Sequence, residues 1–265
     1  MGARLEQALA PIGTVTATSR REVDLAHADS LRQHVRQARP DVIVNAAAYT
    51  AVDKAETETG LATAVNAVAP GVLAEEAKRI GALLVHYSTD YVFSGEASNP
   101  YQEDDAKAPL NAYGRTKLEG EKRVRASGCR HLILRTSWVY DTRGRNFLLS
   151  ILKRARAGDK LRVVGDQQGV PNWSAMVARV TAACLARGGE GLFHLSAAGT
   201  TSWHGFAREA LACADVAAAV EEISSAEYPT QARRPRYSVL DNGKLERAFG
   251  HRFDDWREDL RAALL

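Results

Sequence analysis

Short apolar runs rich in Val, Ile and Leu recur along the chain, and segments with the spacing of amphipathic helices separate them. The runs are TVTAT at 14–18, DVIVNAAA at 41–48, GALLVHYSTD at 81–90 and HLILRTSWVY at 131–140. The intervening segments predict helices near 28–38, 61–79 and 111–127. Runs this short and this apolar indicate strands that are buried on both faces. Their alternation with helices predicts an α/β fold, namely a Rossmann-like doubly wound parallel sheet.

The alternation of apolar runs and helical segments is less regular in the second half of the chain. Helices are expected near 146–157, 173–187 and 202–214, and strands at LRVV (161–164) and GLFHL (191–195). A segment rich in proline and arginine, YPTQARRPRYS at 228–238, follows them. We therefore expect a first domain over 1–150 and a smaller second part over 151–265, partly interleaved with the first.

The start of the chain departs from the pattern of a dinucleotide-binding sheet. Such a sheet begins with a strand and a glycine-rich turn, whose N–H groups hold a pyrophosphate at a helix N-terminus. Here the chain begins MGARLEQALAPIG, so that Gly2 resembles the last glycine of that turn and residues 3–10 the helix after it. The first strand and the earlier glycines are missing, and no GxGxxG occurs elsewhere. Because losing a central strand leaves buried backbone groups unpaired, we expect a further N-terminal segment rather than a natural short form.

Composition narrows the classes of partner. The 265 residues are 45% hydrophobic and 25% charged, which suits a soluble protein with a substantial core, and the formal charge of +3 is too slight to indicate nucleic acid. Cys129, Cys184 and Cys213 form no CxxC pair, so neither a disulfide framework nor a zinc site is indicated. No apolar stretch approaches the roughly 20 residues that cross a bilayer. We expect a reduced, cytoplasmic protein that acts on small molecules.

The candidate chemistry lies where apolar runs end, because the carboxyl ends of parallel strands open into a crevice. Tyr113 and Lys117 are four residues apart and share one helix face. A nearby ammonium favours tyrosinate, so we expect Lys117 to lower the pKa of the Tyr113 phenol toward the range of a general acid. Thr89, at the end of a strand, could hold a carbonyl oxygen for protonation. An ordinary helix face with a core-edge tyrosine and a solvated lysine is the alternative.

Several motifs taken together resemble one known family. VNAAAYTAVDKAE, HYSTDYVFSG, PLNAYGRTKLEGE, LRTSWVY, GTTSW and YPTQARRPRYSVL occur in order over almost the whole chain. This set is similar to the dTDP-4-dehydrorhamnose reductase family, within the extended short-chain dehydrogenase/reductase group. The resemblance implies reduction of a nucleotide-linked keto sugar, dTDP-4-dehydro-L-rhamnose, to dTDP-L-rhamnose with NADPH or NADH. Residues 1–150 would then bind the cofactor and 151–265 mainly the substrate.

The resemblance also implies roles for individual residues. Tyr113 would be the proton donor, Lys117 its electrostatic partner and a ribose ligand, and Thr89 the hydroxyl that orients the carbonyl. The residues that the resemblance places at the cofactor are Gly2, Ala46, Ala47, Ala48, Tyr49, Asn66 and Ser88. Those that it places at the substrate are Thr50, Val52, Asp90, Trp138, Asp166, Gln167, Arg233 and Arg234. Packed strand ends, a core tryptophan, a plain turn and a solvated arginine pair are the corresponding structural alternatives.

Relatives of this family differ in recognisable ways. Sugar-nucleotide 4,6-dehydratases carry Thr-Asp-Glu at the strand end, whereas here Tyr91 follows Thr89 and Asp90, which favours reduction. The segment SRR at 19–21, just after the run at 14–18, lacks the acidic residue that would grip an NAD ribose, whereas Arg20 and Arg21 suit the 2′-phosphate of NADPH. NADPH is therefore expected ahead of NADH.

Three questions stay open at this point. Some family members are metal-linked dimers, but Arg4 stands where a carboxylate would be needed, so no metal is inferred and monomer and homodimer are both possible. A reductase for another nucleotide deoxysugar shares the same motifs. So does a non-catalytic binding protein, the regulatory subunit of methionine adenosyltransferase.

Overall fold

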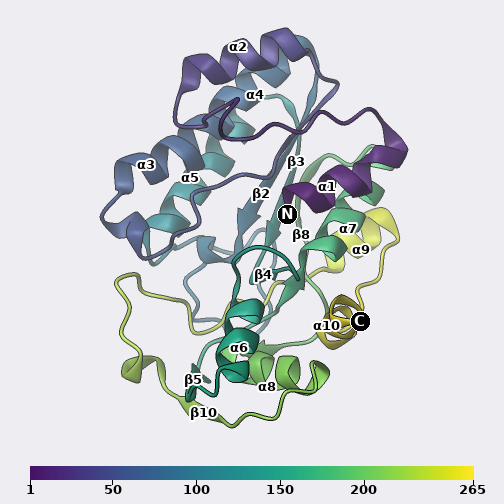
Figure 1. Cartoon of the computed structure of the whole chain (residues 1–265). Coiled ribbons are helices and arrows are strands. Elements are labelled where there is room, and N and C mark those ends of the chain that lie inside the picture. Colours follow the sequence, from purple (N-terminus) through teal and green to yellow (C-terminus); the bar gives the residue numbers. More distant parts are fainter.

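Four parallel strands form the central sheet of the protein, whose computed structural model describes residues 1–265 (Figure 1). They are β1 (Val42–Asn45), β2 (Leu83–Thr89), β3 (Arg130–Thr136) and β8 (Gly191–His194), and they pair in the order β1-β2-β3-β8. Val42 of β1 lies opposite Leu83 of β2, which in turn lies opposite Arg130 of β3. The predicted α/β fold with a parallel sheet is confirmed.

Helices cover both faces of this sheet (Figure 1). The helices α2 (Ala28–Ala38), α4 (Ala69–Ile80) and α5 (Ala112–Ser127) lie on one face, and α1 (Gly2–Leu9) and α7 (Ser174–Ala186) pack together on the other. Successive side chains of a strand point to opposite faces, so Leu84 belongs to the core under α4 and Val85 to the core under α7. Burial on both faces explains why these strands are continuously apolar.

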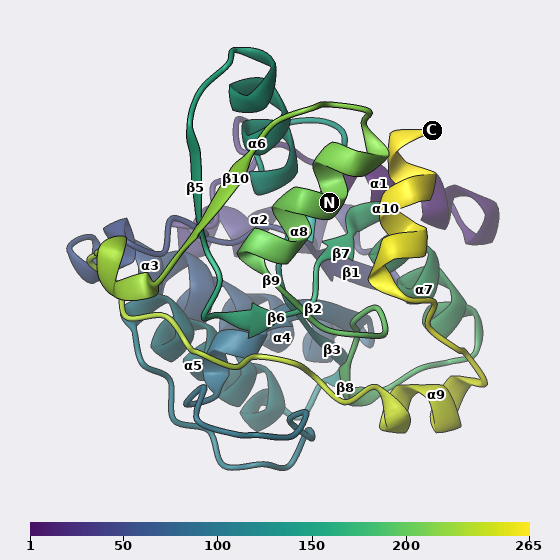
Figure 2. The same ribbon diagram turned by 90° about the horizontal axis from the view of Figure 1, so that it is seen from below.

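Smaller elements connect and extend these layers. The helical elements are η1 (Ala10–Ile12), η2 (Lys54–Glu56), α3 (Thr59–Thr63), the π-helix η3 (Ala64–Val68), η4 (Asp90–Val92), α6 (Phe147–Arg156), α8 (Trp203–Cys213), η5 (Ser225–Glu227), α9 (Gly243–Phe249) and α10 (Trp256–Leu264). Three two-stranded pairs are formed by β5 (Leu161–Val164) with β10 (Val220–Ile223), β4 (Val139–Tyr140) with β7 (Asn172–Trp173), and β6 (Gln168–Gly169) with β9 (Thr201–Ser202). Figure 2 shows β5 and β10 beside α6 and α8, at the end of the molecule opposite α2. None of the helices has the length and apolarity needed to cross a membrane.

The strand predicted at 14–18 is wrong. These residues have no regular structure, and β1 pairs only with β2, so no strand lies along the outer edge of β1. An extended segment becomes a strand only when a neighbour supplies backbone hydrogen bonds, and residues 14–18 have no such neighbour. Val42 at this open edge is 39% exposed.

The predicted helices agree with the structure to within a few residues. One of them, expected near 61–79, is divided into α3, the π-helix and α4. β8, which belongs to the second half of the chain, is a strand of the central sheet, and α7 packs on α1 from the first half.

Candidate functional site

The first turn of α5 lies against the segment that follows β2. Asn111 caps this helix, since its Oδ1 accepts a hydrogen bond from the Gly114 N–H at 2.8 Å. A Cβ on Gly114 would lie 2.2 Å from the carbonyl oxygen of Tyr91. Only glycine permits this close approach, and it places Tyr113 beside the end of β2.

Tyr113, Thr89 and Asp90 meet at this point. The Thr89 hydroxyl donates to Asp90 Oδ1 at 2.8 Å and accepts from the Tyr91 N–H at 3.2 Å. Burial raises the pKa of Tyr113 to about 12, although a hydrogen bond with Thr89 acts in the opposite direction. Burial likewise raises the pKa of Asp90 to about 6. The phenol is therefore fully protonated at neutral pH and can donate a proton.

Lys117 lies one turn further along the same face of α5 and is only 2% exposed. Its Nζ donates to the Tyr87 carbonyl at 2.5 Å and lies 3.4 Å from His86 Nε2. The predicted lowering of the Tyr113 pKa is wrong, because burial of the phenol dominates and Lys117 is directed at the backbone of β2. Burial also lowers the pKa of Lys117 to about 8.

The loop after β1 is held by Asn66 of the π-helix, which is fully buried. Its side chain accepts from the Tyr49 N–H at 2.8 Å, and its Nδ2 donates to the Tyr49 carbonyl at 3.1 Å and to Thr116 Oγ1 at 3.2 Å. A Cβ on Gly120 would lie 2.2 Å from the Asn66 carbonyl oxygen, so α5 and the π-helix cross in close contact. Asn66 therefore joins the loop after β1 to the helix that carries Tyr113.

Three consecutive alanines give this loop a surface of small side chains. Ala46 and Ala48 are half-buried and Ala47 is exposed, while the Tyr49 hydroxyl donates to Glu58 at 2.6 Å. Small side chains at the carboxyl end of a parallel strand allow a dinucleotide to approach the backbone. The small side chains of this loop are thus compatible with the close approach of a dinucleotide.

The Ser88 side chain is buried against α5. Its hydroxyl donates a hydrogen bond to the Glu121 carboxylate. That carboxylate also accepts two hydrogen bonds from the Arg135 guanidinium, at 2.9 and 2.8 Å. Glu121 and Arg135 are 2% and 1% exposed, so this is a fully buried ion pair. Any contact of Ser88 with a cofactor would have to use its backbone.

Segment 228–238, here called the strap, is joined to the loop after β1 by Arg234 and to the cap of α5 by the backbone of Arg233. Arg234 forms a bidentate ion pair with Asp53 at 2.9 and 2.7 Å, and the Arg233 carbonyl accepts from Asn111 Nδ2 at 2.8 Å. The Arg233 side chain is exposed, as is Thr50, whereas Val52 is half-buried. The structure thus brings the predicted residues of the strap close to the cap of α5.

Trp138 and Asp166 already have partners within the protein. Trp138 has a positive φ of 42° and stacks on Trp203, with ring centroids 3.6 Å apart. The Asp166 carboxylate accepts from the N–H and the hydroxyl of Ser225, while Gln167 is buried at 9% exposure. No contact in the structure joins Asp166 or Gln167 to Tyr113.

The predicted cofactor residues near the N-terminus are more open. Arg20 and Arg21 lie exposed on a turn, and Arg20 pairs with Asp24 at 3.2 Å. Gly2 begins α1 as expected, but a Cβ there would meet nothing within 4 Å. Nothing in the structure therefore requires glycine at position 2.

Two features bear on metal binding. No group of three or more His, Cys, Asp and Glu side chains converges as metal ligands do. Arg4 of α1 forms an ion pair at 2.8 Å with Asp141, which lies in the segment after β4.

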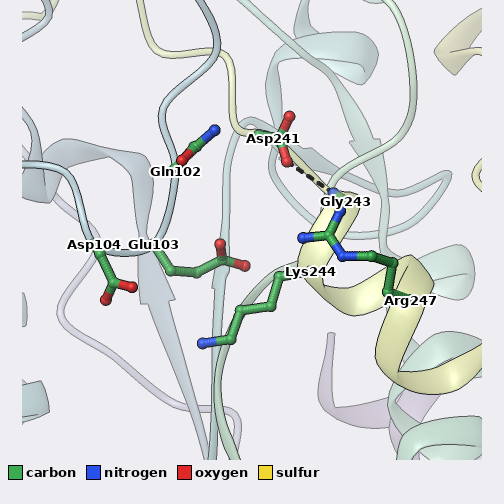
Figure 3. A pocket seen from close by; sticks show the side chains of 7 residues that line it. All are labelled: Gln102, Glu103, Asp104, Asp241, Gly243, Lys244 and Arg247. Carbon is green, nitrogen blue, oxygen red and sulfur yellow. Dashed lines mark hydrogen bonds between the residues drawn. The ribbon is translucent and has the colours of Figure 1, made fainter.

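Two of the cavities of the protein have neither Tyr113 nor Thr89 among their lining residues. One of about 280 Å³ is drawn in Figure 3, and its lining residues are Gln102, Glu103, Asp104, Asp241, Gly243, Lys244 and Arg247. It lies between the segment after β2 and the start of α9, and no apolar side chain lines it. The other, of about 260 Å³, lies between α3 and α5 beside Thr116. Ligand sites are predominantly apolar with a few polar groups, so the first cavity does not resemble one.

Sequence reasoning missed the buried polar residues beneath the site, namely Asn45, His86, Glu121 and Arg135. A signal for two of them was present. His86 and Ser88 alternate on one face of β2, and Lys117 and Glu121 are one helical turn apart on α5, so the two rows can meet.

Comparison with known proteins decides the family. The RmlD substrate binding domain family matches residues 1–265. This chain belongs to that family. A relative named dTDP-4-dehydrorhamnose reductase, from Burkholderia thailandensis, is 44% identical over 97% of this chain and 92% of its own.

Two further similarities are informative. The Bacillus anthracis dTDP-4-dehydrorhamnose reductase, solved in complex with NADP, has a TM-score of 0.96 and 32% identity over 99% of this chain and 94% of its own. A Streptomyces antibioticus protein named as a probable dTDP-4,6-dihydroxy-2-methyloxan-3-one 4-ketoreductase is 39% identical over 94% of this chain and 85% of its own. The family predicted from the motifs is confirmed.

Proposed function

We propose that this protein reduces dTDP-4-dehydro-L-rhamnose to dTDP-L-rhamnose, the last step in making this sugar donor, with NADPH as its preferred reductant and NADH as the other possibility. The observation that carries the proposal is that Thr89 lies beside Tyr113 at the end of β2, with Lys117 buried one turn further along α5, in a chain of this family. The reaction is a reduction of a ketone, and these are the groups that such a reduction requires.

Tyr113 supplies the proton in this proposal. Its phenol, with a pKa of about 12, is protonated at working pH and donates to the keto oxygen as that oxygen gains charge. Thr89 lies beside the phenol, and its hydroxyl can offer the keto oxygen a second hydrogen bond when its proton turns from Asp90 Oδ1 to that oxygen. A bound reduced nicotinamide supplies the hydride that the keto carbon receives.

Lys117 has a supporting role. Tyr113 becomes tyrosinate when its proton leaves, and a cation on the same helix face favours that anion. Because its Nζ is anchored on the Tyr87 carbonyl, the charge is fixed relative to the strand end. Lys117 and the small side chains of Ala46–Ala48 would hold the nicotinamide end of the cofactor, and Arg20 and Arg21 a 2′-phosphate.

The substrate side rests on the strap and its neighbours. Guanidinium groups suit a diphosphate, and Arg233 is exposed while Arg234 is held by Asp53. Thr50, Val52, Asp90 and Trp138 would border the sugar, and Asp166 and Gln167 the remainder of the nucleotide. A small-molecule reaction of this kind, with a nucleotide-sugar substrate, belongs in the cytoplasm.

The test follows NADPH oxidation with dTDP-4-dehydrorhamnose as substrate. Tyr113→Phe should lower kcat by roughly 10²- to 10⁴-fold and leave the Kd for NADPH nearly unchanged, because only the proton donor is lost. Lys117→Ala should both lower kcat and raise the Kd for NADPH. Tyr140→Phe is the matched control, since that buried phenol has no hydrogen-bond partner and lies outside the site. Undiminished turnover in Tyr113→Phe would remove the proposed acid.

A second candidate is supported by the similarity to the Streptomyces ketoreductase. The same assay with other dTDP-linked 4-keto sugars distinguishes the two candidates by kcat/KM. NADPH oxidation with none of these sugars would instead favour a binding role without catalysis.

A further inference from the structure

Three buried polar side chains form a continuous row from β1 through β2 to α5. Asn45 Nδ2 lies 3.2 Å from His86 Nδ1, and His86 Nε2 lies 3.4 Å from Lys117 Nζ. Asn45, His86 and Lys117 are 6%, 1% and 2% exposed. Side chains this deeply buried obtain their hydrogen bonds from one another rather than from water.

The hydrogen bonds of this row can form only if every donor faces an acceptor, which restricts where the protons lie. An amide nitrogen only donates, so Asn45 in this orientation requires a lone pair on His86 Nδ1, and the neutral ring then carries its proton on Nε2. An Nε2–H can bond Lys117 only if Nζ has a lone pair, which a neutral amine has and an ammonium lacks. A charged Lys117 instead needs Nε2 as acceptor, with the ring proton on Nδ1 and the Asn45 amide turned to present its oxygen.

We propose that Asn45 and His86 are positioning residues for Lys117, and that the tautomer of the His86 ring is coupled to the charge of Lys117. This inference rests on the proposed function, in which Lys117 acts as a cation. The Tyr87 carbonyl fixes Nζ from one direction, and the His86 ring fixes it from a second. Two acceptors in different directions locate the end of a long, flexible side chain, whereas one leaves it free to rotate.

Few titratable or charged side chains surround Lys117. β2 contributes His86, and α5 contributes Tyr113 one turn before and Glu121 one turn after. Glu121 is paired with Arg135 of β3, while β1 and the π-helix contribute the neutral amides of Asn45 and Asn66. Burial holds the pKa of His86 well below its usual range, so the ring stays neutral near neutral pH. The titration expected in this row is therefore that of Lys117.

Lysine-selective NMR of the substrate-free protein tests the inference directly, by following the side-chain signal of Lys117 against pH and assigning it by its loss in Lys117→Met. His86→Leu removes the second acceptor and should lower the pKa of Lys117 by about one unit, because a hydrogen bond to a charged group favours that charge. His86→Gln can present an amide oxygen to Nζ and should restore the wild-type pKa. An unchanged Lys117 pKa in His86→Leu would overturn the inference.

Asn45→Asp provides a variant with the opposite sign, should His86→Leu not fold. A carboxylate accepts from Nδ1–H and so forces the ring proton onto Nδ1, and its charge acts in the same direction. The pKa of Lys117 should therefore rise. A fall, or no change, would contradict the coupling through the ring.

Kinetics separate positioning from a merely structural role. In His86→Leu the alkaline limb of the kcat/KM profile should move to lower pH together with the NMR titration, and His86→Gln should move it back. A lower melting temperature with an unmoved limb would mean that His86 serves stability alone. If the wild type fails to reduce the keto sugar while His86→Leu still lowers the Lys117 pKa, the proposed function fails and the coupling stands.

Discussion

The residues proposed for chemistry and those proposed for recognition occupy contrasting surroundings. Lys117 and Thr89 are 2% and 4% exposed, and their polar atoms have partners within the protein. Arg21, Thr50 and Arg233, by contrast, are exposed. The chemical groups are thus fixed before any ligand arrives, and the exposed groups must be ordered by the ligand itself.

The two groups of residues differ in the conformational entropy that they lose when a ligand binds and reacts. A proton donor that is already oriented loses little entropy in the transition state, which favours catalysis. A solvated arginine loses side-chain freedom on binding, so its contribution to affinity is correspondingly smaller. Substitutions under the chemical groups should therefore have the larger effects.

The strongest expected effect is on the buried ion pair beneath the site. Glu121→Gln leaves the Arg135 guanidinium buried without its counter-charge, and we expect a loss of about 3 kcal/mol in the free energy of unfolding. Urea denaturation measures it. Glu119→Gln, on the same helix but paired with Arg123 at the surface, should cost under about 1 kcal/mol. Equal losses in the two variants would show that burial of the pair is not what matters.

A smaller effect is expected at the strap. Arg234→Ala removes the proposed diphosphate ligand and its tie to Asp53, and should raise KM by about tenfold with kcat little changed, equivalent to about 1.4 kcal/mol of binding. Steady-state kinetics with the keto sugar provide the measurement. Arg236→Ala, an exposed arginine on the same strap, is the control. A fall in kcat at constant KM would place Arg234 with the chemical groups instead.

The smallest effect is expected at the exposed turn near the N-terminus. Replacing Arg20 and Arg21 by alanine should reduce the preference for NADPH over NADH, measured as a ratio of kcat/KM values, by a few-fold to about tenfold, since exposed charges are screened. Arg154→Ala removes an exposed pair with Asp159 of the same 3.2 Å length and should leave the ratio unchanged. A ratio that does not move in the double variant would assign the cofactor preference to other residues.

The sequence predicted those parts of the fold that depend on local periodicity. The strands at 42–45, 83–89 and 130–136 and the helix at 112–127 all follow from apolar spacing and from the residues at their ends. The strand at 14–18 failed because a strand also needs a neighbour, which periodicity does not report. The short pairs β4-β7 and β6-β9 escaped prediction for the same reason.

The candidate site divides in a similar way. Thr89, Tyr113 and Lys117 could be recognised from their spacing and motif context, and in the structure Thr89 lies beside Tyr113 while Lys117 is buried one turn further along α5. Two physical facts were out of reach. The pKa of Tyr113 depends on burial, and the direction of Lys117 depends on the Tyr87 carbonyl and on His86, and both of these follow from packing between β2 and α5.

The crossing of α5 and the π-helix at Gly120 and Asn66 limits how this protein can change. A single methyl group at position 120 would meet the Asn66 carbonyl and force the two helices apart. Asn66 holds Tyr49 on one side and Thr116 on the other, so that separation would disturb the loop after β1 and the proton donor at once. The loop after β1 and the helix that carries Tyr113 are therefore mechanically coupled, and a change in one is expected to shift the other.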